Sequence, residues 1–156
     1  MENKILTSLQ EEEDMIAIGC DHGGYALKRE IMAHLEERGL EYKDYGCYSE
    51  ESVDYPIYGK AVANAVASGE CENGIIICGT GIGISITANK VKGIRAALCG
   101  DCFSAQATRE HNNANILALG ARVTGPGLAI KIVDTFLDTP FSNDERHVRR
   151  IQMIEG

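Results

Sequence analysis

The chain has 156 residues, a formal net charge of −8 at pH 7, 44% hydrophobic residues and 24% charged residues. This length fits one domain, and these proportions are ordinary for a soluble globular protein. The acidic balance argues against broad binding to nucleic acid or to acidic membranes. No apolar run approaches the roughly 20 residues of a membrane helix, so we expect a cytoplasmic protein.

The first 14 residues, MENKILTSLQEEED, differ in character from the rest of the chain. They carry an acidic cluster where an export signal would have its apolar core. We therefore expect residues 1–14 to form a mobile leader and residues 15–156 to form the single domain.

From residue 15 onward, short apolar or β-branched segments alternate with helical patterns. The helical segments repeat apolar residues every three or four positions, as in Leu27, Ile31 and Leu35, and several end near a glycine. In chain order, the pattern predicts strands at 15–19, 41–45, 74–78, 94–98 and 116–120, and helices near 27–35, 58–66, 83–90, 101–110, 126–136 and 143–154. This alternation predicts an α/β fold: a single-domain, three-layer αβα sandwich, Rossmann-like, with about five parallel strands and helices on both faces.

In such sheets, ligands bind beyond the carboxyl ends of the strands. Residues 74–90 read GIIICGTGIGISITANK, which places Cys78 at the end of an apolar strand and before a glycine-rich turn. Glycines at this position let backbone N–H groups converge on an anion at a helix N-terminus. A site is therefore expected at this edge of the sheet.

The glycine turn departs from the common nucleotide-binding motifs. A P-loop requires GxxxxGK, which is absent, and a dinucleotide fingerprint requires GxGxxG, where this chain has isoleucine at position 84. Asp101 does follow the next strand at about the spacing expected for ribose recognition, which leaves NAD binding as an alternative.

Cys78 itself has two chemical interpretations and one structural one. A thiolate is favoured at a helix N-terminus, so Cys78 could act as a nucleophile in a thiol hydrolase or as a base on a carbon acid. The adjacent amides would hold the oxyanion that develops. The structural alternative is a small hydrophobic residue that ends a buried strand.

The other cysteines predict no cofactor. The six cysteines form no disulfide framework, and the lone CxxC at Cys99–Cys102 lacks the second pair that a zinc site needs. We expect reduced thiols, with a redox role for this pair as an alternative.

Six segments together resemble a known family. They are GCDHGGYALK (19–28), VDYP (53–56), GIIICGTGIGISITANK (74–90), GIRAALC (93–99), REHNNANILALGAR (109–122) and ERHVRRI (145–151). In this order they are similar to the sugar-phosphate isomerases that comprise ribose-5-phosphate isomerase B and the galactose-6-phosphate isomerase subunits. The resemblance covers residues 15–155 and implies a metal-free aldose–ketose isomerase that works through a cis-enediolate.

The resemblance also implies a role for particular residues. Cys78 resembles the base that moves a proton between C1 and C2, Thr80 the hydroxyl beside it, and His111 the acid that opens the furanose ring. The remaining implied contacts are with substrate: Gly79, Gly81, Ile82 and Gly83 cradle the enediolate, Asn112 binds sugar hydroxyls, Asp21 and His22 reach the ring oxygen and the phosphate end, and Arg122, Arg146 and Arg150 bind phosphate.

Residue chemistry agrees with two of these assignments. Arg146 and Arg150 lie four residues apart on one helical face, where a phosphate between them would offset their repulsion. Asp21 has an alternative role as a helix cap. His147 is expected at the surface, with contact to the phosphate as an alternative because it neighbours the arginines.

The family resemblance further implies a homodimer or a dimer of dimers with a pocket shared between subunits. The preferred substrate implied is D-ribose 5-phosphate in exchange with D-ribulose 5-phosphate. The alternatives are a hexose 6-phosphate such as galactose or allose 6-phosphate, an unphosphorylated aldose, or a non-catalytic module that binds phosphosugars or NAD.

Overall fold

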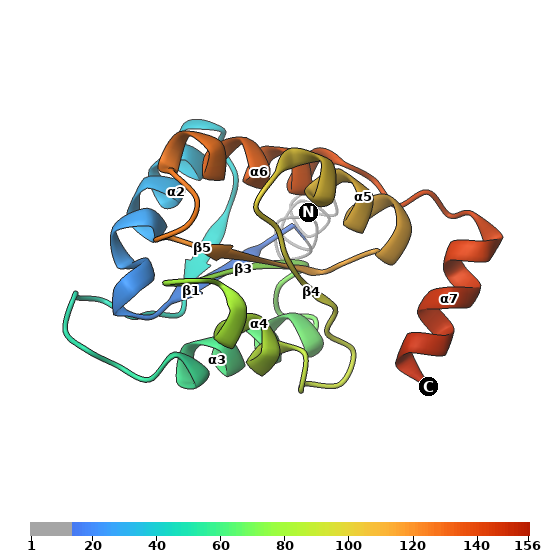
Figure 1. The fold of residues 1–156 in the computed structure, drawn as a ribbon, viewed down its shortest axis with the longest axis horizontal. Coiled ribbons are helices and arrows are strands. Elements are labelled where there is room, and N and C mark those ends of the chain that lie inside the picture. Colours follow the sequence, from blue (N-terminus) through green and yellow to red (C-terminus); the bar gives the residue numbers. More distant parts are fainter. Residues whose placement is uncertain (1–13) are drawn as a thin grey trace, which may run out of the picture.

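The computed structural model of the protein describes residues 14–156 and forms one α/β unit (Figure 1). Residues 1–13 of the predicted leader lie outside the described residues, so that prediction remains untested. The elements in chain order are β1 (Ile16–Cys20), a 3₁₀ turn (His22–Gly24), α2 (Tyr25–Glu37), β2 (Tyr42–Asp44), α3 (Tyr55–Ala67), β3 (Asn73–Cys78), α4 (Ile82–Ala88), β4 (Ala96–Leu98), α5 (Cys102–Asn112), β5 (Ile116–Gly120), α6 (Pro126–Asp138) and α7 (Glu145–Glu155).

Every strand and helix expected from the sequence pattern is present, with small shifts at the ends. The edge strand β4 begins two residues later than predicted, and α3 begins at Tyr55 with Pro56 in its first turn. Proline is favoured there because the first turn does not use its N–H groups. Of the helices among residues 14–156, none is both long and apolar enough to cross a membrane.

The five strands form one parallel sheet in the order β2-β1-β3-β5-β4. The central strand β3 pairs with β1 through Cys20–Ile77 and with β5 through Cys78–Gly120. Because the strands are parallel, the ends of β1, β3 and β5 meet at the same edge of the sheet. The predicted Rossmann-like fold class is confirmed.

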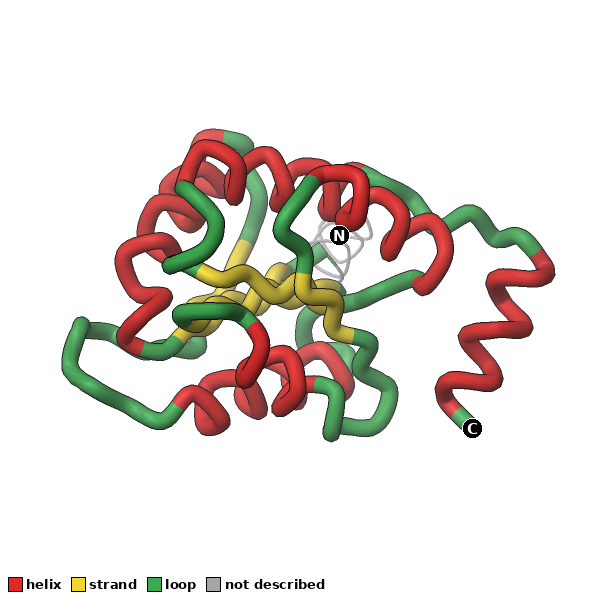
Figure 2. Tube along the Cα trace, viewed as in Figure 1, coloured by secondary structure: helices red, strands yellow, loops and turns green. Residues whose placement is uncertain are grey.

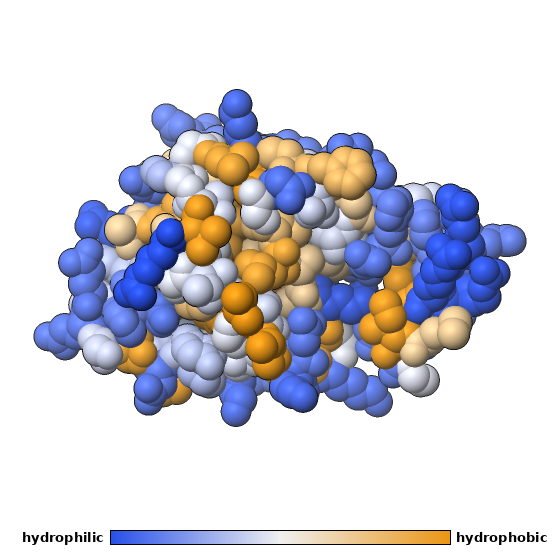
Figure 3. All heavy atoms as spheres, viewed as in Figure 1, coloured by the Kyte–Doolittle hydropathy of each residue, from blue (hydrophilic) through white to orange (hydrophobic). Residues whose placement is uncertain are grey.

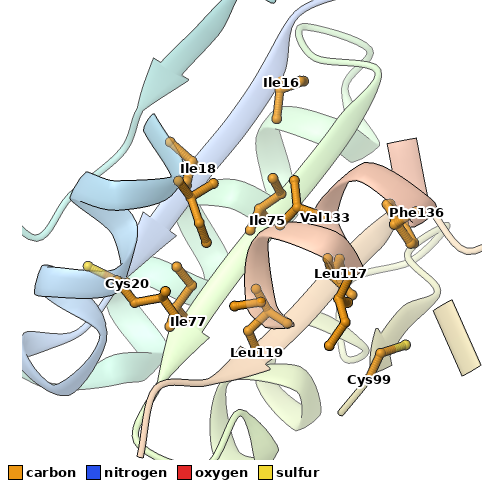
Figure 4. Packing of buried hydrophobic residues seen from close by; sticks show 14 of the residues in the cluster. Ile16, Ile18, Cys20, Ile75, Ile77, Cys99, Leu117, Leu119, Val133 and Phe136 are labelled. Carbon is orange, nitrogen blue, oxygen red and sulfur yellow. The ribbon is translucent and has the colours of Figure 1, made fainter. Parts of the chain in front are cut away.

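Helices cover both faces of the sheet, with α2, α5 and α6 on one side and α3 and α4 on the other (Figures 1 and 2). Alternate residues of β3 point to opposite sides: Ile75 and Ile77 join the core beneath α2 and α6, whereas Ile76 and Cys78 join the core beneath α3 and α4 (Figure 4). Burying one isoleucine contributes about 1.5–3 kcal/mol, so an apolar central strand stabilises both layers at once.

The last helix, α7, projects to one side of the body and packs on α5 (Figure 1). It keeps Met153 and Ile154 exposed, at 75% and 62% of their surface. Exposed apolar side chains also gather over α4 and the edge strand β4, where Ile82, Ile86 and Leu98 lie (Figure 3). These exposed apolar surfaces could pack against another chain.

Candidate active site

Cys78 ends β3 and is 4% exposed. Its Sγ accepts a hydrogen bond from the backbone N–H of Gly81 at 3.1 Å. Gly81 has φ +78°, a left-handed conformation that glycine adopts without a steric penalty, and it caps the N-terminus of α4. The turn therefore directs a backbone N–H donor at the sulfur.

The rest of the glycine turn surrounds this thiol. Thr80 is exposed, and its Oγ1 accepts a hydrogen bond from the N–H of Ile82 at 3.2 Å. A Cβ atom at Gly83 would lie 2.6 Å from Cζ of Tyr55, so the helix start packs closely against that ring. Thr80 thus presents a hydroxyl to solvent beside Cys78.

Asp21 and His22 follow β1 and lie next to this turn. The N–H of Asp21 donates to the carbonyl of Ile77 at 3.2 Å, and its Oδ1 accepts from the N–H of Gly24 at 3.1 Å. Asp21 therefore does cap the 3₁₀ turn, as the alternative interpretation expected. Nδ1 of His22 accepts from the N–H of Val53 at 3.1 Å, so the neutral ring carries its proton on Nε2.

Arg122 follows β5 and lies beside the same two turns. Its backbone N–H donates to the carbonyl of Gly79 at 2.9 Å. A Cβ at Gly79 would lie 3.4 Å from Nη1 of Arg122, and one at Gly23 would lie 3.6 Å from Nη2. The exposed guanidinium therefore covers the turns after both β1 and β3, beside Cys78.

We call these residues the strand-end group. Its members come from the end of β3 and from the segments after β1, β3 and β5, and they are Asp21, His22, Cys78, Gly79, Thr80, Gly81, Ile82, Gly83 and Arg122.

His111 and Asn112 lie in a different place, in the last turn of α5, and both are exposed. The ring of His111 contacts the ring of His147, with centroids 4.5 Å apart. Contrary to the sequence expectation, His147 is 7% exposed, because the edge of α7 that carries it faces α5. Nδ1 of His147 lies 2.8 Å from Oγ of Ser142.

Arg146 and Arg150 are on α7 and both are exposed. The side chain of Arg146 is 60% exposed, and its Nε lies 3.6 Å from Oδ1 of Asp144. An ion pair this exposed contributes little stability, so its geometry allows Arg146 to accept another anion. We call His111, Asn112, Arg146 and Arg150 the α5–α7 group.

The two groups lie at opposite edges of the sheet. Helix α5 begins after the carboxyl end of β4 and, with 11 residues, runs about 16 Å back toward the amino ends of the strands. Beyond its end, Asn113 accepts from Nη2 of Arg95 at 3.0 Å, and Asn115 accepts from the N–H of Gly74, at the start of β3. One chain by itself therefore does not bring His111 to Cys78.

The carboxylate of Asp101 is occupied by helix capping. It accepts from the N–H of Ser104 at 2.6 Å and from its hydroxyl at 2.9 Å, and these bonds lower the pKa of Asp101. Because both carboxylate oxygens are used, this residue is poorly placed to bind the ribose of NAD.

The buried thiol of Cys99 is unreactive at neutral pH. Burial raises the pKa of Cys99 to about 11, so the first thiol of the CxxC pair stays protonated at neutral pH. A protonated thiol is neither a nucleophile nor a good redox partner, which argues against the redox alternative.

The fold and sequence have clear relatives. Residues 16–154 match the family described as Ribose/Galactose Isomerase. The chain is 54% identical over 139 residues to ribose-5-phosphate isomerase B of Escherichia coli (strain K12), covering 89% of this chain and 93% of the relative. It is 45% identical over 141 residues to a galactose-6-phosphate isomerase subunit of Clostridium acetobutylicum, covering 90% of this chain and 82% of the relative.

The solved structure of Clostridium thermocellum ribose-5-phosphate isomerase B superposes with a TM-score of 0.89 at 58% identity, covering 90% of this chain and 95% of that chain. The matched region includes the strand-end group and the α5–α7 group alike. The protein therefore belongs to the ribose/galactose isomerase family.

Proposed function

We propose that this protein interconverts D-ribose 5-phosphate and D-ribulose 5-phosphate as an intramolecular oxidoreductase. The observation that carries the proposal is the thiol of Cys78, held at 3.1 Å by the N–H of Gly81 at the exposed edge of the sheet. The 54% identity to ribose-5-phosphate isomerase B of Escherichia coli supports this substrate.

In the proposed reaction, Cys78 is the base. Its thiolate takes the proton from C2 of the open aldose, and the C2 electron pair forms the enediolate as charge develops on O1. The thiol then returns the proton to C1, which yields the ketose. Positioned acid–base groups of this kind contribute about 10²–10⁴ in rate.

The glycine turn is proposed to stabilise the charge that develops on the substrate oxygens. Thr80 would move the proton between O1 and O2, and the amides of residues 79–83 would donate to the enediolate. Asp21 and His22 would bind the sugar from the β1 side. Each of these groups follows the carboxyl end of a strand, where ligands of parallel sheets bind.

The other half of the site is proposed to come from a second copy of the chain. His111 would protonate the ring oxygen to open the furanose, and Asn112 would bind sugar hydroxyls. Since these residues lie at the far edge of the sheet from Cys78, a homodimer with a shared pocket joins the two groups. Exposed Ile82, Ile86 and Leu98 beside the glycine turn support such a contact.

The phosphate is proposed to bind between arginines of both copies. Arg122 stands in the strand-end group, and Arg146 and Arg150 stand in the α5–α7 group, each exposed. Phosphate accepts the forked donors of guanidinium well, and its charge offsets the repulsion between them. Such a clamp would also help to hold the two copies in register.

A second substrate class has its own support. The 45% identity to a galactose-6-phosphate isomerase subunit favours a hexose 6-phosphate as the alternative. Purified protein should be incubated with ribose 5-phosphate, galactose 6-phosphate, allose 6-phosphate and unphosphorylated ribose, with ketose formation followed in each case. We expect the highest kcat/KM for ribose 5-phosphate; a higher value for a hexose phosphate would assign the alternative, and no turnover of any of them would overturn the proposal.

A further inference from the structure

Lys28 is a buried lysine that belongs to neither group. It lies on α2 and is 0% exposed, next to Leu27 and one turn from Ile31 on the face that packs on the sheet. Removing an ammonium group from water is unfavourable unless partners replace its hydration. The partners of Lys28 therefore indicate what the buried charge does.

Two oxygen atoms from one turn receive this ammonium. Nζ of Lys28 donates to Oδ1 of Asp44 at 2.7 Å and to the backbone carbonyl of Cys47. The same Oδ1 of Asp44 accepts from the N–H of Gly46 at 2.8 Å. Lys28 therefore binds the turn after β2 at both of its ends, at Asp44 and at Cys47, and Asp44 also binds Gly46 within the turn.

This turn is in contact with the end of β1, one residue before the strand-end group. The N–H of Cys20 donates to the carbonyl of Gly46 at 2.6 Å, and the N–H of Cys47 donates to the carbonyl of Cys20 at 2.7 Å. Gly46 has φ +99°, and a Cβ there would lie 2.8 Å from the ring of Tyr58. The turn has little room to shift relative to Asp21.

The same segment then reaches the imidazole of the site. The N–H of Val53 donates to Nδ1 of His22 at 3.1 Å. Residues 44–53 are therefore anchored at their start by the ammonium of Lys28, and near their end they hold the ring of His22. A displacement of the segment would be transmitted to that ring.

We propose that Lys28 is a positioning residue that acts through segment 44–53 to orient His22 toward the substrate. This inference rests on the proposed function, in which His22 binds the sugar phosphate. An apolar side chain of similar volume would stabilise a core at least as well as a buried ion pair, so stability alone does not account for a lysine here. The ammonium of Lys28, by contrast, holds Oδ1 of Asp44 and the carbonyl of Cys47 at one point.

The first test uses Lys28→Met, which keeps the volume and removes the charge. We expect KM for ribose 5-phosphate to rise about tenfold with kcat changed less than about twofold, because a substrate contact is loosened and the reacting groups are untouched. Leu35→Ala, on the same face of α2 two turns from Lys28, is the matched control. It should lower the melting temperature and leave KM unchanged; an equal rise in KM for both variants would overturn the inference.

A double-mutant cycle then asks whether Lys28 acts through His22. If it does, Lys28→Met should add little to the KM of a His22→Ala variant, because the contact it positions is already gone. Fully additive effects would overturn the proposal.

A readout independent of activity separates this inference from the proposed function. Hydrogen exchange at the Val53 amide should quicken in Lys28→Met, and the ¹⁵N shifts of His22 should show a mixture of tautomers in place of one. Unchanged values would overturn the positioning role even in an active enzyme, and altered values would support it even if ribose 5-phosphate were not the substrate. If Lys28→Met does not fold, Asp44→Asn gives the same test, with a smaller expected shift in the same direction.

Discussion

The strand-end group and the α5–α7 group contrast in how the fold holds them. Cys78 is 4% exposed and bonded to the turn that follows it, at the end of a strand paired on both sides. Arg146, whose side chain is 60% exposed, lies on a helix that leaves the body of the protein. The backbone of the first group is held by the paired strand ends, whereas the arginine side chains of the second group are exposed to solvent.

This contrast suggests that two copies of the chain divide the proposed site between them, one copy supplying the strand-end group and the other the α5–α7 group. The chemistry that needs accurate placement belongs to the sheet edge, where errors of about 1 Å are costly. The groups proposed to open the ring and to bind phosphate stand on helices that a partner chain would bring into place. Substitutions in each group, alone and in mixed dimers, test that division.

The largest effect is expected from the thiol. Cys78→Ala should lower kcat by about 10³-fold or more, because the variant lacks the proposed base for proton transfer between C1 and C2. The readout is ketose formation under saturating ribose 5-phosphate. Cys102→Ala is the control and should retain activity, since that thiol starts α5 outside both groups. Normal turnover by Cys78→Ala would reassign the base.

Mixing two inactive variants tests whether the site is shared. Cys78→Ala and His111→Ala each damage a different group, so a mixed dimer would contain one intact pocket and one doubly damaged pocket. After denaturation and refolding together, random pairing should restore about a quarter of the parent activity. A site formed within one chain would give no recovery, because every chain carries a lesion.

Substitution of the arginines should change substrate binding and leave the chemical step unaffected. Replacing Arg146 or Arg150 by alanine should raise KM about 10–100-fold, because a hydrogen bond to a charged group is worth about 1.5–3 kcal/mol. Arg149→Ala, which removes another exposed arginine of the same helix that is outside the proposed clamp, should leave KM as it is. Equal effects at all three positions would indicate general charge attraction and no defined clamp.

The smallest effect concerns stability at high pH. Burial raises the pKa of Cys20 to about 12 and that of Cys99 to about 11, from 9.0 in the unfolded chain. Between pH 9 and these values the unfolded state loses protons that the folded state keeps, so stability falls as pH rises. Urea midpoints should therefore decrease from pH 8 to pH 11, and less steeply for Cys99→Ala. A midpoint that stays constant would contradict the pKa shifts of both thiols.

The fold was largely predictable from local pattern. The isoleucines of β3 and the spacing of Leu27, Ile31 and Leu35 specify a strand covered on both faces and a one-sided helix, because burial follows the geometry of each element. The burial of Lys28 was not predicted from this pattern. Its position next to Leu27, on the apolar face of α2, was the available signal, but only the packed structure supplies Asp44 and Cys47 as its partners.

His147 shows the same limit. A histidine between arginines on an amphipathic helix is expected at the surface, yet the contact with α5 buries His147 against His111. Whether one face of a helix meets water or another helix depends on where the chain brings that helix. Sequence periodicity carries no such information.

The sequence by itself determined the elements, the α/β class, the glycine turn after Cys78 and the family, because each follows from residue types at short range or from letters in order. Only the tertiary structure decided that Asp21, Cys78 and Arg122 share one edge of the sheet while His111 and Arg146 occupy the other. The physical reason is that parallel pairing aligns strand ends regardless of their distance in sequence, and that α5 carries its last turn back across the length of the sheet.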